Sequence, residues 1–251
     1  MIFKKVKVQD ASGAILAHKR IGKDWSIKKG QILTKDNCAK LELIGIKEVF
    51  VAILDKEDMH EDEASSWLAN EIMGNAVEVT VPFTGRCNII SKTNGILLIN
   101  KEVVNKLNHV DEVMTIATLP HRSSIKKGQV VATIKVIPFA ISSKVKIRLL
   151  DILLGSKNII SINPFKKKKF SLINTTSPTL KDSLVLKTTN VTKNRIENID
   201  GTLVSIDSCP HDIDSVSLKI SKILKLKSDM IIISGAHVSV DRNDILPMAI
   251  I

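Results

Sequence analysis

Two polar segments combine residue types that suit the binding of an anionic small molecule. The first, 174–181, carries four hydroxyl side chains and ends in a lysine; the second, 234–244, carries a Gly-Ala pair, two aspartates and an arginine. Hydroxyls, backbone N–H groups and a basic side chain ahead of a helix suit a phosphate group. A pair of small residues lets the backbone approach a ligand closely. The two segments therefore predict a site for a phosphate-bearing ligand.

The second segment admits two interpretations. Asp241 and Asp244 could hold Mg²⁺ or accept hydrogen bonds from a heterocycle, and Arg242 could clamp an anion. Alternatively, Asp244 only caps the following helix, with Pro247 in its first turn. The hydroxyls of the first segment are likewise ordinary in turns. Capping and ligand binding are compatible, so both interpretations stay open.

The elements around these segments predict a parallel sheet. Short apolar runs at 170–174, 202–207 and 229–234 are typical of strands, and the last is uninterrupted, as in a buried parallel strand. Helices are expected over about 181–198 and after Asp212, which is placed to cap the second of them. The order βαβαβ gives parallel strands with right-handed crossovers. Ligands of such sheets bind at the carboxyl ends of the strands, where both polar segments begin.

The sequence of the N-terminal part, residues 1–165, predicts a β-rich structure with one clear helix. Val6–Val8 and Ala14–Ala17 are strand-like, and the pentapeptide Ile-Lys-Lys-Gly-Gln occurs at 27–31 and again at 125–129. A Lys-Gly pair between apolar residues is a turn signal. The repetition predicts two similar turns, although a pentapeptide is too short to indicate a duplicated domain.

The clear helix begins at His60, with three acidic residues in its first turn, where the helix dipole favours negative charge. Its predicted buried stripe recurs at spacings of three and four residues and consists of Ala64, Trp67, Leu68 and Ile72. A zinc motif of the H-E-x-x-H type is excluded, because Ala64 stands where the second histidine would be.

A domain boundary is expected after Asn163-Pro164, where Phe165 and four lysines follow. Proline disfavours helix in the residue before it, and a run of lysines repels itself into solvent. A solvated linker explains the run better than a nucleic-acid signal does. The predicted domains are a β-rich N-terminal region at 1–165 and an α/β domain at 166–251.

Composition limits the function classes. The chain has 251 residues, 44% of them hydrophobic and 25% charged, and its apolar runs are too short to span a bilayer. The N-terminus lacks the apolar core of a signal peptide, and the three cysteines form no CxxC pair, so a cytoplasmic location is expected. The net charge is +11, but only six of the 37 basic residues are Arg, and aromatic residues make up 3%. That composition disfavours nucleic-acid binding, which remains an alternative.

Several stretches carry a resemblance to a known family. The segment 234–250 resembles the second signature loop of the molybdopterin-binding domain used in molybdenum cofactor biosynthesis. His60–Ala69, Ala117–Pro120 and Val131–Phe139 resemble parts of a bacterial molybdopterin-binding protein family. The resemblance covers nearly the whole chain.

The resemblance implies a Rossmann-like parallel-sheet domain at 166–251, apparently incomplete at its C-terminus, that binds molybdopterin. It places the ligand against Thr175, Thr176, Ser177, Lys181, Gly235, Ala236, Ser239, Asp241, Arg242 and Asp244, with Mg²⁺ possible on Asp241 and Asp244. In some members a C-terminal transferase domain similar to cytidylyltransferases follows, and a homo-oligomer is a further possibility.

Departures from the family pattern favour binding over catalysis. Thr176 stands where a glycine is usual, Pro178 where an acid is usual, and Ala236 replaces the second glycine of a pair. The expected role is therefore to present the pterin-phosphate cofactor for maturation or transfer. The alternative role is catalytic molybdenum insertion, or nucleotidyl transfer to molybdopterin.

Overall fold

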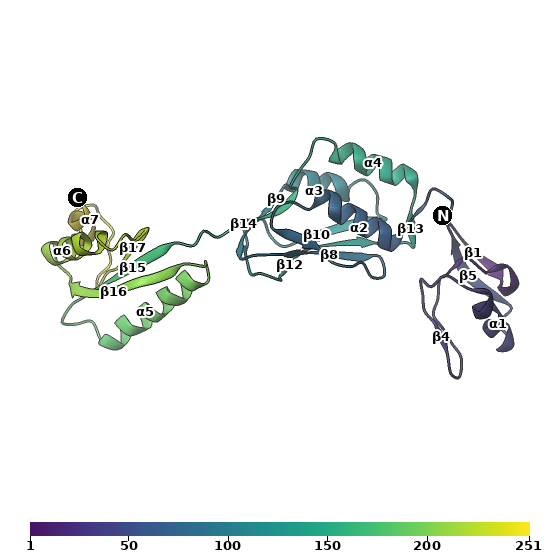
Figure 1. The fold of residues 1–251 in the computed structure, drawn as a ribbon, viewed down its shortest axis with the longest axis horizontal. Coiled ribbons are helices and arrows are strands. Elements are labelled where there is room, and N and C mark those ends of the chain that lie inside the picture. The colour runs from purple at the N-terminus through teal and green to yellow at the C-terminus, as the bar shows by residue number, and fades with distance from the viewer. The chain divides into compact units, whose positions relative to one another are not determined.

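A computed structural model describes residues 1–251 and divides into two compact units, Met1–Asn163 and Pro164–Ile251 (Figure 1). The division falls at the Asn163-Pro164 peptide bond, just ahead of the four lysines. Each unit has its own hydrophobic core and is described by itself. None of the seven helices combines the length and the apolar character that crossing a membrane requires.

Unit 1 is built from many short strands and four helices. In chain order its elements are β1 (Ile2–Lys7), a 3-10 turn (Val8–Asp10), β2 (Ile15–Leu16), β3 (Arg20–Ile21), β4 (Ser26–Ile27), α1 (Lys35–Leu43), β5 (Glu48–Ile53), β6 (Met59–His60), α2 (Glu61–Ile72), β7 (Val77–Val79), β8 (Arg86–Ser91), β9 (Gly95–Ile99), α3 (Lys101–Asn108), β10 (Met114–Thr118), β11 (Ser124–Ile125), β12 (Val130–Val136), β13 (Ala140–Ile141), α4 (Ser143–Leu153) and β14 (Ile160–Pro164). Unit 2 contains β15 (Lys169–Thr176), α5 (Asp182–Glu197), β16 (Thr202–Pro210), α6 (Ile213–Leu224), β17 (Met230–Ser234) and α7 (Ile245–Ile250).

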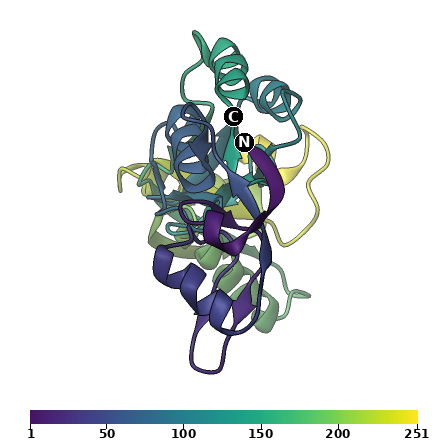
Figure 2. The same cartoon turned by 90° about the vertical axis from the view of Figure 1, so that its right-hand side faces the viewer.

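The sheets of unit 1 are antiparallel wherever two strands are paired along their length. The first sheet has the order β1-β5-β2, and its inner face, with Val49 and Val51, packs on Leu41 of α1. Its purple and dark-blue ribbon faces the viewer in Figure 2. A four-stranded sheet, β10-β12-β8-β7, and a three-stranded sheet, β11-β9-β14, contribute to the larger core.

Helix α2 lies where the sequence predicts it and buries the predicted stripe. His60 occupies the N-cap position, and its Nδ1 accepts the Asp62 N–H at 3.3 Å. Ala64, Leu68 and Ile72 are fully buried, and the larger Trp67 is half-buried against the same core.

The repeated pentapeptide forms the same turn twice. Gly30 and Gly128 adopt φ values of +83° and +81°, a region that favours glycine. In both copies the glutamine side chain accepts the N–H of the first lysine at 3.1 Å. Each turn docks on another strand through paired backbone bonds, the first to Leu16 and the second to Ser91.

The expectation of a single helix in the N-terminal part is wrong. Three further helices, α1, α3 and α4, are 9, 8 and 11 residues long. Each begins at a side-chain cap, in which Thr34, Asn100 or Ser142 accepts the N–H three residues later. These caps satisfy free N–H groups of each first turn, and α4 also buries an apolar stripe of Val145, Leu149 and Leu153 at a spacing of four residues.

Unit 2 contains a parallel sheet in the order β16-β15-β17, which confirms the predicted pairing of its three strands. Phe170 pairs with Leu203 on one side and with Met230 on the other. Helix α5 covers one face, and α6 and α7 cover the other, as Figure 1 shows. Asp212 caps α6 as predicted, since its Oδ1 accepts the Ser215 N–H at 2.8 Å.

The Rossmann-like fold class is nevertheless wrong for this chain. The parallel sheet has only three strands, whereas the other sheets are small and antiparallel, so the architecture is mixed α and β. Three parallel strands satisfy the βαβαβ pattern without the long doubly wound sheet that the fold class requires.

Candidate functional site

The two polar segments meet at the carboxyl edge of the parallel sheet, and the Thr175 hydroxyl joins them. Its Oγ1 accepts the Ala236 N–H at 2.7 Å and lies 3.3 Å from the Ser234 carbonyl oxygen, to which it donates. The same oxygen lies 2.7 Å from His211 Nδ1, at the end of β16. Thr175 is 1% exposed. It therefore ties three strand ends together and is not free to contact a ligand.

His211 is held at this edge in a defined orientation. His211 Nδ1 and the Thr175 hydroxyl share the 2.7 Å hydrogen bond, which orients the imidazole. The His211 ring packs edge-on against that of His237, with 5.1 Å between centroids. His211 thus gives the site a polar atom outside the two loops considered at first.

The rest of the first segment lines the approach to α5. The Thr176 hydroxyl donates to the Cys209 carbonyl at 3.3 Å, and the Ser177 hydroxyl lies 3.2 Å from that of Thr179. Lys181 is exposed at the N-cap position of the 16-residue helix α5 and makes no side-chain cap bond. The first turn of α5 thus has N–H groups that no side chain caps, beside an exposed lysine.

The second segment folds back on itself through its two aspartates. Asp244 Oδ2 accepts the N–H groups of Val240 and Asp241 at 2.6 and 2.8 Å, and Asp241 Oδ1 accepts that of Asn243 at 2.8 Å. These backbone bonds hold the pKa of the Asp244 carboxyl below its ordinary value. Asp244 is the N-cap residue of α7, as one interpretation predicted, but its side chain accepts no N–H of that helix and instead organises the loop before it.

Each carboxylate of the predicted magnesium pair uses one oxygen for backbone N–H groups, Asp241 Oδ1 for Asn243 and Asp244 Oδ2 for Val240 and Asp241. No third His, Cys, Asp or Glu side chain joins the pair, so a magnesium ion here would be held by at most two carboxylates together with water and ligand oxygens. No chemical step is assigned to a metal here. Ser239 and Arg242 are exposed on this loop; the Ser239 side chain hydrogen-bonds to Asp244, and the Arg242 guanidinium is available to a ligand.

A small cavity opens beside the loops on the α5 side of the sheet. Its volume is about 50 Å³, and its lining consists of Asn174, Thr175, Leu180, Leu184, Val185, Thr188, Ser234 and Gly235. Asn174 is 3% exposed, and its Oδ1 is buried without a hydrogen-bond partner. Since buried polar atoms are almost always paired, this oxygen marks a position where a donor is missing.

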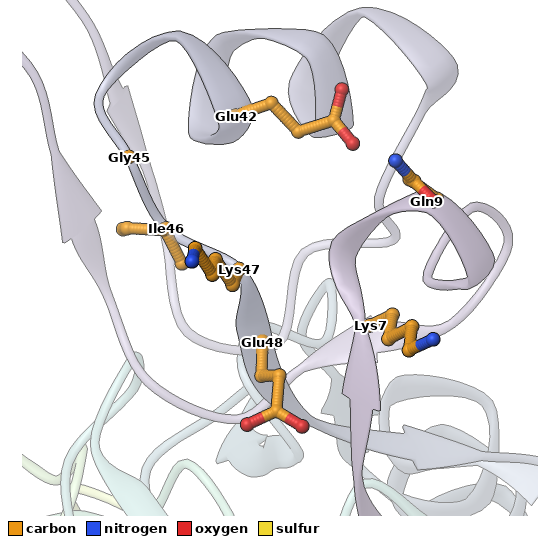
Figure 3. A pocket seen from close by; sticks show the side chains of 7 residues that line it. All are labelled: Lys7, Gln9, Glu42, Gly45, Ile46, Lys47 and Glu48. Atoms are coloured by element: carbon orange, nitrogen blue, oxygen red, sulfur yellow. The ribbon is translucent and has the colours of Figure 1, made fainter.

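A larger hollow lies elsewhere, in unit 1 (Figure 3). It is an open groove of about 600 Å³, lined by Lys7, Gln9, Glu42, Gly45, Ile46, Lys47 and Glu48. Its two lysines and two glutamates cancel in charge, and a hydrogen bond from Lys5 keeps the pKa of Glu48 low. The groove contains no His or Cys and no buried polar atom without a partner. We therefore place the candidate site in unit 2.

Comparison with known proteins leaves the function open. Residues 5–53 match a family described as a domain of unknown function, DUF8806. That match covers the first sheet of unit 1 and α1, and it does not extend to unit 2. None of the curated proteins matches the chain.

Asn174 and His211 were not among the predicted site residues. Asn174 interrupts the apolar run of β15, and a polar residue that the strand pattern buries is a signal of a hydrogen-bonding role. His211 directly follows β16, so its position at a strand end was a second signal. The remaining predicted residues lie on the same two loops, and Thr175 and Ala236 are in direct contact.

Proposed function

We propose that unit 2 binds molybdopterin at the carboxyl ends of β15 and β17 and presents it during molybdenum cofactor biosynthesis. The observation that carries the proposal is the bond from Ala236 N–H to Thr175 Oγ1, which brings both predicted loops to one edge of a parallel sheet. Such edges are where α/β sheets bind ligands. The sequence resemblance of the 234–250 segment supplies the identity of the ligand.

The charges and donors around this edge suit the phosphate end of the ligand. Lys181 is exposed beside the first turn of α5, where uncapped N–H groups and the helix dipole favour an anion, and its charge offsets that of Asp182 in the same turn. Arg242 is exposed on the facing loop and can donate to phosphate oxygens from its guanidinium. Each of these bonds is charge-assisted.

The geometry supports binding more than catalysis. Thr175 Oγ1 and Asp244 Oδ2 accept hydrogen bonds from backbone N–H groups. Neither Asp241 nor Asp244 belongs to a cluster of three or more potential metal ligands. The side chains of Asn174 and His211 are the further polar groups at this edge. The unit therefore holds its ligand, and a partner enzyme performs the transfer.

The proposal is tested by analysing what the protein carries. The full chain is produced in a bacterial host that makes molybdopterin, purified without oxygen, and its bound small molecules are oxidised and identified by mass spectrometry. A pterin phosphate in near-stoichiometric amount supports the proposal. A host protein purified in parallel controls for non-specific carry-over.

A further inference from the structure

The Asn174 side chain presents its oxygen, and not its amino group, to the small cavity. Asn174 Nδ2 donates to Thr189 Oγ1 at 2.9 Å, and Thr189 Oγ1 donates to the Val185 carbonyl at 2.9 Å. Because a hydroxyl has a single hydrogen, Thr189 can serve Asn174 only as an acceptor. The amide is thereby oriented, and Oδ1 remains the unpartnered atom.

The cavity around Oδ1 is built for one small donor group. Leu180, Leu184 and Val185 make one side apolar, and the strand ends at Ser234 and Gly235 form the other. About 50 Å³ admits an amino group or a water molecule and little more. An acceptor-only amide oxygen in such a space selects an N–H or O–H donor and rejects a carbonyl.

The cavity and the proposed anion site share residues. Ser234 and Gly235 line the cavity and begin the second loop, while Thr175 follows Asn174 directly in β15. Side chains alternate across a strand, so Asn174 faces α5 while Thr175 faces the opposite side of the sheet. A ligand bound at the strand ends therefore lies next to the cavity that Asn174 lines.

We propose that Asn174 determines specificity by accepting a hydrogen bond from the exocyclic amino group of a pterin ring. This inference rests on the function proposed above, because the ring is that of the proposed ligand. It adds which group of the ligand is recognised, the exocyclic amino group, and which protein atom recognises it, Asn174 Oδ1. In the complex, Asn174 Oδ1 then accepts its hydrogen bond from the ligand.

Two ring compounds separate this inference from the proposed function. Pterin carries an amino group at the ring position where lumazine carries an oxygen, so the pair exchanges a donor for an acceptor. Fluorescence titration of the full chain with each compound is expected to give at least about tenfold tighter binding of pterin, which corresponds to about 1.4 kcal/mol. Equal affinities mean that the cavity holds only water, and they overturn the inference while leaving pterin binding intact. If neither compound binds, the proposed function itself is overturned.

Variants assign the preference to Asn174. Asn174→Leu is expected to abolish the preference for pterin, whereas Asn174→Asp, which keeps an oxygen acceptor in the cavity, is expected to retain it. Asn190→Leu, an exposed position on α5, is the matched control and should behave as wild type. Melting curves of all variants verify folding. An undiminished preference in folded Asn174→Leu overturns the assignment.

Discussion

The Ala236 N–H and the Thr175 hydroxyl oxygen are 2.7 Å apart, although 61 positions separate the two residues. The bond joins the loop after β17 to the end of the central strand β15. Thr175 is also in contact with His211 after β16, so one buried hydroxyl holds all three strand ends in register. The geometry of the candidate site depends on this atom more than on any charged residue.

Replacing Thr175 by valine tests that dependence. The shapes are similar, but valine leaves the Ala236 N–H and the His211 Nδ1 without their partner. A buried group left unsatisfied costs about 1–3 kcal/mol, so the free energy of unfolding should fall by that amount. Urea titration measures it. Thr179→Val, at an exposed position of the same loop, should change stability by less than about 0.5 kcal/mol. Equal effects of the two substitutions would show that the Thr175 hydroxyl does not hold the edge together.

Asp244 should make the loop sensitive to acid. Its pKa is lowered in the folded protein by the N–H groups of Asp241 and Val240, relative to about 3.9 in an unfolded chain. A lowered folded pKa gives stability that is present above the unfolded pKa and is lost as the pH falls through the folded pKa. Melting temperatures of wild type and Asp244→Asn should thus differ at pH 7 and converge toward pH 2. A constant difference across this range contradicts the assigned role.

Asn174→Leu should not lower the stability of the ligand-free protein. The wild-type side chain buries an oxygen without a partner, and replacing such a group with an apolar one of similar size is nearly neutral or stabilising. Thr189 keeps its bond to the Val185 carbonyl. The melting temperature of the variant is therefore expected to equal or exceed that of wild type. A drop of several degrees would show that the bond from Asn174 to Thr189 outweighs the unpaired oxygen.

The thiol of Cys209 should be unreactive in the folded protein. Burial raises its pKa above the ordinary value, and the same holds for Cys38 and Cys87. Since the thiolate is the reactive form, labelling with a disulfide reagent at pH 7.5 should be at least about tenfold slower in the native state than in guanidinium chloride. Rapid native labelling of Cys209 would mean that the edge near Thr176 opens readily.

The sequence predicted unit 2 better than unit 1 for a physical reason. The strands around Phe170 and Met230 are apolar runs separated by helix-length segments. A connection of that length can cross over the sheet, which predicts parallel pairing of the strands that it joins. In unit 1 the three missed helices have only 8 to 11 residues and stand between strands as short as two residues, so the apolar pattern of each helix extends over only two or three turns. The number of parallel strands was overestimated because a three-stranded sheet and a larger doubly wound sheet both begin with the order βαβαβ.

The candidate site was predicted in part. Thr175 and Ala236 were both expected at the strand ends, but their direct contact removes the threonine from the ligand surface. Asp244 was expected to cap a helix, and a carboxylate can equally well accept N–H groups from the preceding loop, which local sequence does not distinguish. Asn174 was missed because its role depends on Thr189 of α5, a partner that only the tertiary structure supplies.

The most direct test of the central claim is the amount of pterin phosphate that co-purifies with wild type, Lys181→Ala and Arg242→Ala. Each charge-assisted bond is worth about 1.5–3 kcal/mol, so each variant should bind roughly 10- to 100-fold more weakly. Lys187→Ala and Arg195→Ala, exposed on α5, are the matched controls. The account predicts a bound pterin phosphate in wild type and both controls, and its loss in both loop variants. Absence of a pterin phosphate from wild type, or equal amounts in all five proteins, would contradict a molybdopterin site at this edge.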